Sequence, residues 1–296
     1  ADSTDDVLAL TDHALGAALD AADGRLLAAR VVIGGACRAH AELTANSEQF
    51  ANEVRALQGV DLAIDDGSFV IVIGTNGSGK STLLNAVAGS FIVDRGHIEL
   101  GGRDVTRWPE HRRAQLIGRV FQNPFAGTAP MMTVAENLAM AGKRGLVRGL
   151  GRALHSSMKA KFRDDIRQMG LGLEGRLDNA IGSLSGGQRQ SITLLMATLR
   201  KPNLLLLDEH TAALDPKSAD QVIRLTDEVI RRDRLTTLMV THSMHQAAHL
   251  GDRLIMMVRG RVLHDIRGVE KQRLTPEDLL ARFEEGNGAT TFADSS

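Results

Sequence analysis

The fold of this chain is decided by residues 69–89, which read FVIVIGTNGSGKSTLLNAVAG. The first five residues are apolar and predict a buried strand, and apolar residues at helical spacing after the loop predict a helix that ends at Gly89. The loop between them, residues 74–81, matches the pattern GxxxxGK(S/T). A strand before it and a helix after it form the context in which this pattern binds phosphate.

The chemistry of this loop indicates a nucleotide. Its glycines let backbone N–H groups turn toward an anion at the N-terminus of a helix, where the macrodipole already favours negative charge. Lys80 would reach the β- and γ-phosphates, and the Ser81 hydroxyl would hold Mg²⁺. We therefore predict a phosphate site made of Gly74, Thr75, Asn76, Gly77, Ser78, Gly79, Lys80, Ser81 and Thr82.

Composition excludes some classes of protein. Lys and Arg number 35 against 36 Asp and Glu, so the chain has no overall field that would attract nucleic acid. Cys37 is the one cysteine, which excludes an internal disulfide and fits a reducing compartment. The longest apolar runs, such as 204–207 and 254–258, have the length of strands rather than of membrane spans.

Strands and helices alternate along much of the chain. Besides the strand before the phosphate loop, we expect strands at 60–64, 97–100, 118–121, 203–207, 235–240 and 253–258. This alternation predicts a mostly parallel sheet with its chemistry at the C-terminal ends of the strands. Gly74, Gln122, Asp208 and His242 each fall just past such an end.

Residues 123–183 interrupt this alternation and look helical. Thr133–Glu136 is a capping-box sequence that predicts the start of one helix. The segment 143–163 is strongly basic, which fits either a solvated helical face or contact with a partner or with lipid head groups.

Two adjacent acids follow the apolar run 204–207. Asp208 is placed to assist Mg²⁺ coordination, as in other phosphate-loop nucleoside triphosphatases. Glu209 is then the natural group to orient and polarise an attacking water. The alternative is a strand end that carries two solvated acids.

A second glycine pair follows Ser185, in the sequence LSGGQ at 184–188. It could be only a helix cap. Alternatively, Ser185 and the bare backbone of Gly186 and Gly187 form a second helix N-terminus that faces an anion. The chain would then have two phosphate-binding surfaces, although one nucleotide needs only one.

With these motifs in order, the chain resembles the ATP-binding subunits of ABC transporters over about residues 54–268. The resemblance rests on the segments that match the family's Walker A, Q-loop, signature, Walker B, D-loop and H-loop, namely Gly74–Thr82, Gln122, Leu184–Gln188, Leu204–Glu209, Ala213–Asp215 and His242. LSGGQ in this order is the most specific of them.

The resemblance implies a fold and an activity. The fold would be an α/β phosphate-loop sheet with helices on both faces, an antiparallel β edge and an inserted helical subdomain at about 123–183. The activity would be hydrolysis of ATP with Mg²⁺. The residues implied in catalysis are Glu209, His242, Gln122 and Lys80, and those implied at the metal are Ser81, Gln122 and Asp208.

The resemblance also implies partners. ATP would lie between Walker A of one copy and the signature of a second, head-to-tail copy, through Ser185, Gly186, Gly187 and Gln188. Gln122 would sense Mg²⁺ and water, and His242 would contact the γ-phosphate. The inserted helices would grip membrane permease subunits, so that loss of the γ-phosphate opens the dimer and moves them.

Some positions depart from the family. His210 stands where a proline is usual, and we expect ATP turnover to survive because Glu209 is intact. Phe50 is at about the place of the aromatic residue that stacks on adenine, with a packing phenylalanine as the alternative. We interpret residues 1–49 as an atypical extension that forms either one or two amphipathic helices or a loosely attached arm, 50–285 as the ATPase domain and 286–296 as a flexible tail.

The leading hypothesis is a peripheral ATPase at the cytoplasmic face of the membrane, which drives an importer that also uses permease subunits and a solute-binding protein. The run DEHTAALDPKSAD, 208–220, resembles import ATPases found beside amino-acid-type binding proteins, some of them thought to handle aromatic amino acids. The alternatives are a soluble ABC ATPase that acts on nucleic acid or ribosomes, and the motor of an exporter or of lipid extraction.

Overall fold

The computed structural model of the chain describes residue 57 and residues 59–146 and 154–283. The predictions for the extension 1–49, for Phe50 and for the tail 286–296 lie outside the described residues, as does the middle of the basic segment 143–163.

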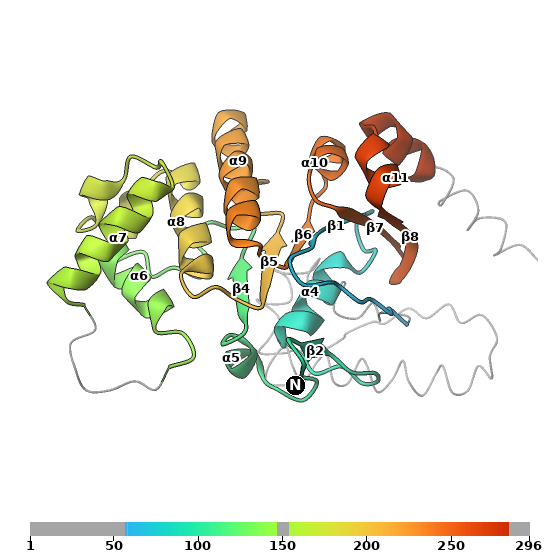
Figure 1. Cartoon of the computed structure of the whole chain (residues 1–296), viewed down its shortest axis with the longest axis horizontal. Helices are drawn as coiled ribbons and strands as arrows, with labels where there is room; N and C mark the ends of the chain where they lie inside the picture. The colour runs from blue at the N-terminus through green and yellow to red at the C-terminus, as the bar shows by residue number, and fades with distance from the viewer. Residues whose placement is uncertain (1–56, 58, 147–153, 284–296) are drawn as a thin grey trace, which may run out of the picture.

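A six-stranded sheet forms the centre of the molecule (Figure 1). Its strands, in spatial order, are β4 (Ile117–Val120), β5 (Leu204–Asp208), β6 (Thr237–Val240), β1 (Phe69–Gly74), β7 (Arg253–Val258) and β8 (Arg261–Arg267). Strands β4 to β7 pair in parallel, and β8 pairs antiparallel with β7 at one edge. The predicted α/β fold with an antiparallel edge is confirmed.

Helices cover both faces of this sheet because its central strands are apolar on both sides. Phe69, Ile71 and Ile73 of β1 pack in one core with the helices α8 (Gly186–Thr198), α9 (Pro216–Asp233) and α10 (Met244–His249). Val70 and Val72 face the opposite way and pack with α4 (Lys80–Ala88). The strand that leads into the phosphate loop is therefore packed between helices on both faces of the sheet.

The expected helical subdomain is a third core at the left of Figure 1. It contains α6 (Val134–Gly142), α7 (Ser156–Gln168) and part of α8. The Thr133 hydroxyl accepts from the Glu136 N–H and the Glu136 carboxylate accepts from the Thr133 N–H, so the predicted capping box is confirmed. In the described part of the chain, no helix combines the length and the apolar character that a membrane crossing requires.

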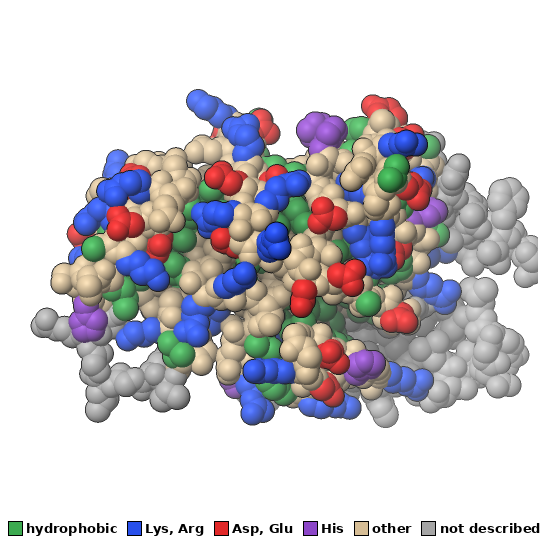
Figure 2. Space-filling view, viewed as in Figure 1, with side chains coloured by type: hydrophobic (Ala, Val, Ile, Leu, Met, Phe, Trp, Pro, Cys, Tyr) green, Lys and Arg blue, Asp and Glu red, His purple; other side chains and the backbone are tan. Residues whose placement is uncertain are grey.

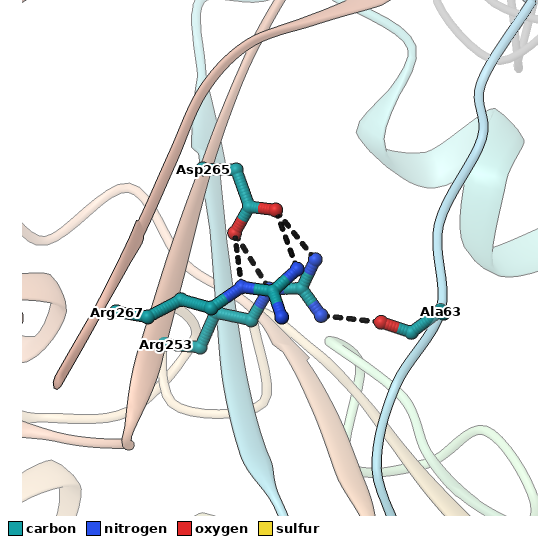
Figure 3. A network of polar contacts seen from close by, with 4 residues as sticks. All are labelled: Ala63, Arg253, Asp265 and Arg267. Carbon is teal, nitrogen blue, oxygen red and sulfur yellow. Dashed lines mark hydrogen bonds and ion pairs between the residues drawn. The ribbon is translucent and has the colours of Figure 1, made fainter.

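The prediction of a strand at 60–64 is wrong. Val60, Leu62 and Ile64 are half-buried and the residues between them are exposed, as expected, but the segment forms no ladder. A side chain holds it instead, because the guanidinium of Arg253 donates to the Ala63 carbonyl (Figure 3).

Figure 3 shows that the same Arg253 is fixed by the edge hairpin β7–β8. Arg253 and Arg267 both donate to the Asp265 carboxylate, with Arg253 at 2.6 Å from each oxygen. Hydrogen bonds from Arg253, and then from Arg267, lower the pKa of Asp265. Arg253 is 6% exposed, so this cluster holds a buried cation against the segment 60–64.

Several short elements complete the fold. The expected strand at 97–100 is the two-residue strand β2 (Glu99–Leu100), which pairs antiparallel with β3 (Arg103–Asp104). Pro109 is the N-cap of the short helix α5 (Glu110–Arg113). Strand β8 and the helices α10 and α11 (Gly268–Arg273) follow no pattern identified in the sequence.

Candidate functional site

The predicted site residues lie at the C-terminal ends of neighbouring strands of the sheet. Gly74 ends β1 and Asp208 ends β5, while Gln122 and His242 follow shortly after β4 and β6. Because these four strands are adjacent and parallel, their C-terminal ends meet at the same edge.

The phosphate loop has the geometry of an anion cradle. Gly79 is the N-cap of α4 with a φ of 96°, a left-handed conformation that favours glycine. The first N–H groups of α4 have no acceptor within the helix. A Cβ atom on Gly74 would overlap the Ser78 hydroxyl and the Met257 carbonyl, and the buried Ser78 hydroxyl has no hydrogen-bond partner among the described residues. Small residues, the N–H groups of a helix N-terminus and an unpaired hydroxyl together fit a bound phosphate.

Lys80 is 5% exposed within this cradle. Its Nζ donates to the carbonyls of Gly74 at 2.9 Å and Thr75 at 3.0 Å. An ammonium group has a third N–H donor, which remains for an anion. Burial lowers the pKa of Lys80, and the negative charges of Glu209 and Asp208 oppose that shift. A phosphate would supply the charge that this buried cation lacks.

Asp208 is the partly buried anion of the site. Burial raises its pKa, and the guanidinium of Arg119 is the main influence that opposes this. Arg119 Nη2 lies 3.6 Å from Asp208 Oδ2 and donates to Asn85 Oδ1 of α4 at 2.7 Å. Sequence reasoning missed Arg119, which joins the strand end to the phosphate-loop helix.

Glu209 is the centre of a polar cluster. His242 Nε2 lies 2.6 Å from Glu209 Oε1, and Gln122 Nε2 donates to Oε2 at 3.3 Å. The backbone of Glu209 has a φ of 45°, which is unusual for a residue with a side chain. Three of the four residues proposed as catalytic are thus in direct contact, and a water between Glu209 and a phosphate at Lys80 could be oriented there.

The signature segment is both a cap and an exposed surface. Ser185 is the N-cap of α8, where its hydroxyl accepts from the Gln188 N–H at 3.3 Å and its N–H donates to Gln188 Oε1 at 3.1 Å. Both side chains are exposed. The glycines have a further role, because a Cβ atom on Gly187 would lie 2.7 Å from Ser218 Cβ at the start of α9.

Two buried residues after the signature tie α8 to the segment that holds Gln122. Arg189 donates to three carbonyls, of Ile181, Gly182 and Leu184, and its guanidinium lies 3.8 Å from the centre of the Phe125 ring. Gln190 Nε2 donates to the Phe121 carbonyl at 2.9 Å. Polar residues on a helix that begins with glycines were the only sequence signal for these contacts.

His210, the departure beside Glu209, is buried. Its Nε2 lies 3.1 Å from Thr226 Oγ1 of α9, and its Nδ1 has no partner among the described residues. Burial lowers the pKa of His210 to about 4, so the ring is neutral near pH 7.

Comparison with known proteins agrees with this geometry. The family model described as ABC transporter matches residues 57–212. A tyrosine transport ATP-binding protein of Clostridioides difficile is 45% identical over 227 residues, which cover 77% of this chain and 90% of that protein. A second family model, Metallophosphoesterase YhaO middle domain, matches residues 1–64, a small part of the chain.

Other relatives have different roles. An Fe(3+) ions import ATP-binding protein of Streptomyces avermitilis is 33% identical over 77% of this chain, and the match spans 62% of that protein. A lipoprotein-releasing system ATP-binding protein of Caulobacter vibrioides is 35% identical over 73% of this chain and 89% of that protein.

Solved structures of ABC cassettes share the fold. One is an ATP-binding cassette of an ABC transporter in its ADP conformation, with a TM-score of 0.64 and 26% identity over 78% of this chain and 92% of that one. Another is the dimeric post-hydrolysis state of a cassette bound to ADP and Pi, with a TM-score of 0.60 and 27% identity over 71% of this chain and 90% of that one. This chain belongs to the ABC transporter family, and it is an ATP-binding cassette that hydrolyses ATP.

Proposed function

We propose that this ATPase drives a membrane importer from the cytoplasmic face, with ATP bound between two copies of the chain. The observation that carries the proposal is the contact of Glu209 with His242 and Gln122 at the sheet edge that also holds the buried Lys80.

The proposed roles follow from these positions. Lys80 and the N-terminus of α4 bind the phosphates, Glu209 orients and polarises water, and His242 and Gln122 hold the Glu209 carboxylate. Ser81, Gln122 and Asp208 would hold Mg²⁺. One carboxylate with neutral oxygens suits this ion, which keeps waters and nucleotide oxygens as its other ligands. The ion would neutralise charge on the phosphates.

A second copy explains the exposed signature segment. Ser185 and Gln188 are exposed at the N-terminus of α8, whose N–H groups suit an anion. In the proposed dimer they bind the γ-phosphate held by Lys80 of the other copy, and loss of that phosphate separates the two. The dimeric cassette bound to ADP and Pi supports this arrangement by similarity.

Membrane subunits would contact the segment after Gln122. Phe125 is 54% exposed and Met131 is 92% exposed, and Arg189 links Phe125 to the signature helix. A permease that packs on these side chains would sense both the Gln122 segment and α8. By similarity to the tyrosine transport protein, we propose an aromatic amino acid as the cargo and a solute-binding protein as a further component.

A second candidate is the motor of a system that releases lipoproteins rather than importing solutes. The relative from Caulobacter vibrioides supports it at 35% identity. Uptake of labelled tyrosine and phenylalanine separates the two candidates. In cells that overproduce Glu209→Gln beside the native protein, an importer predicts reduced uptake, whereas unchanged uptake would contradict the importer and its cargo.

The proposed chemistry is tested with purified Glu209→Gln. We expect ATP hydrolysis to fall by about 100-fold or more, because the water loses its base. We also expect a stable dimer with MgATP in light scattering after gel filtration, because the γ-phosphate is retained. The matched control is Glu228→Gln, an exposed acid of α9 outside the site.

Each half of the proposal can fail separately. Undiminished hydrolysis by Glu209→Gln would remove the role of Glu209. A strictly monomeric Glu209→Gln protein with MgATP, together with full activity of Ser185→Arg, would remove the shared nucleotide site.

A further inference from the structure

Groups outside the polar cluster of Glu209, His242 and Gln122 hold the backbone turn at Glu209. Its φ of 45° places a long side chain in the left-handed region, which persists only where the surroundings determine it. The Glu209 N–H donates to the Val240 carbonyl at 3.0 Å, and its own carbonyl accepts from the Ala212 N–H at 2.9 Å. These two backbone bonds fix Glu209 itself but do not involve the next residue, His210.

His210 is 1% exposed and reaches the middle of α9. The Thr226 hydroxyl lies 2.7 Å from the Val222 carbonyl, which can only accept, so the single hydroxyl proton is directed there. The oxygen of Thr226 must then accept from His210, whose Nε2 lies 3.1 Å away and therefore carries a proton. The bonds thus run in one direction, from His210 through Thr226 to the helix backbone.

We propose that this bond positions Glu209. With His210 anchored to α9, the chain must turn at Glu209, and the turn directs the carboxylate toward His242 and Gln122. His210 and Thr226 are therefore positioning residues that act through Glu209. The inference rests on the proposed role of Glu209 as the group that orients water.

Four variants test the bond itself. His210→Phe keeps the ring and removes the donor, and Thr226→Val keeps the shape and removes the acceptor. His210→Gln keeps an N–H donor at a similar reach, and Thr226→Ser keeps the hydroxyl. Because the Thr226 hydroxyl retains its bond to Val222 in His210→Phe, that variant leaves no buried donor unpaired and should melt no lower than the wild type.

The readouts separate positioning from folding. For His210→Phe and Thr226→Val, we expect kcat to fall by about 10-fold, because a displaced base lowers turnover. The Kd of a fluorescent ATP analogue should change less than about 2-fold, since Lys80 and its loop are untouched. His210→Gln and Thr226→Ser should retain most of kcat. The double variant His210→Phe/Thr226→Val should lose no more kcat than the less active of the two single variants, because both substitutions remove the same bond.

The matched control is Thr198→Val. Thr198 donates to the Leu194 carbonyl of α8 at 2.9 Å, the same kind of helix bond, but it lies outside the site. We expect its kcat to equal that of the wild type. A loss of kcat as large as that of Thr226→Val would show that any such helix hydroxyl matters, and would overturn the inference.

Further results would also overturn it. These are wild-type kcat in His210→Phe, equal losses in Thr226→Ser and Thr226→Val, or losses that multiply in the double variant. Glu209→Gln, measured in parallel, shows which proposal has failed. If it abolishes hydrolysis while His210→Phe keeps the wild-type kcat, only the positioning role is wrong. If it hydrolyses normally, the role of Glu209 itself is wrong.

Discussion

At the residue scale, the site combines a buried cation, Lys80, and a partly buried anion, Asp208, and burial disfavours the charge of each. Burial lowers the pKa of Lys80 and raises that of Asp208, and each charge partly offsets the shift of the other. Arg119 adds a cation beside Asp208 from β4. In the proposed function, the phosphates would supply negative charge at Lys80 and Mg²⁺ would supply positive charge at Asp208.

Asp265 gives a prediction about pH. Its pKa in the folded protein is below the ordinary 3.8, so its ion pairs stabilise the fold fully above about pH 4 and lose that effect as the pH falls further. Asp265→Asn should lower the free energy of unfolding at pH 7 by about 1–3 kcal/mol, because Arg253 loses charged hydrogen bonds. Urea unfolding of both proteins from pH 7 to pH 2.5 measures this.

The difference between wild type and Asp265→Asn should shrink below about pH 4, because the unfolded wild-type chain takes up a proton at Asp265 near its ordinary pKa while the folded carboxylate stays charged. Asp66→Asn, an exposed acid outside the cluster, is the control and should show little difference at any pH. A difference that stays constant down to pH 2.5 would contradict a lowered pKa at Asp265.

Residues at strand ends could be predicted from the sequence, and their partners could not. Gly74, Asp208 and Glu209 follow apolar runs, and this placement alone indicates the edge of a parallel sheet. Arg119 and Thr226 carry no such signal. Their partners lie far along the chain or across a helix, and only packing brings them together.

At the element scale, the signature glycines bring two helices together. The Cβ that Ala would add at Gly187 would lie 2.7 Å from Ser218 Cβ and 2.9 Å from its hydroxyl, so α8 could not approach α9 as closely. Gly187→Ala should lower the free energy of unfolding by about 1–3 kcal/mol through this overlap. Ser218→Gly should recover part of the loss, because it removes the atoms that collide.

Urea unfolding of the two single variants and of Gly187→Ala/Ser218→Gly forms a double-mutant cycle that measures this coupling. Gly186→Ala is the control, because its Cβ would meet only the flexible Leu214 side chain, at 3.1 Å. Strictly additive free energies would show that Gly187 is not needed for packing on α9.

Elements with a strong apolar period were predictable, and weakly patterned ones were not. The strand β7 has the predicted bounds because all six of its residues are buried. The segment 60–64 shows the alternating burial of a strand, but a strand also needs a neighbour to pair with, which periodicity cannot reveal. Strand β8 has one buried residue and many charged ones, so nothing in its composition indicates a strand.

At the scale of the whole molecule, α8 belongs to two cores. Leu194 and Ala197 pack with the sheet, whereas Ile192, Leu195 and Met196 pack with the helical subdomain. In Figure 1 this helix stands between α7 and α9. A single helix that carries the signature at its start therefore connects the subdomain to the sheet, and the resemblance to ABC cassettes predicted the subdomain but not this shared helix.

Because α8 packs in both cores, we expect the sheet and the helical subdomain to unfold together. Ile166 of α7 is fully buried in the subdomain, and Ile166→Ala should cost about 2–5 kcal/mol. Trp108, the single tryptophan, packs on the far side of the sheet and reports only that core. If α8 couples the cores, Ile166→Ala shifts the urea midpoint of Trp108 fluorescence as far as that of the far-ultraviolet circular dichroism.

A tryptophan midpoint that stays at the wild-type value, while the helical signal is lost earlier, would mean that the subdomain unfolds alone. In that case α8 could not transmit movement from the nucleotide to the inserted helices by rigid packing.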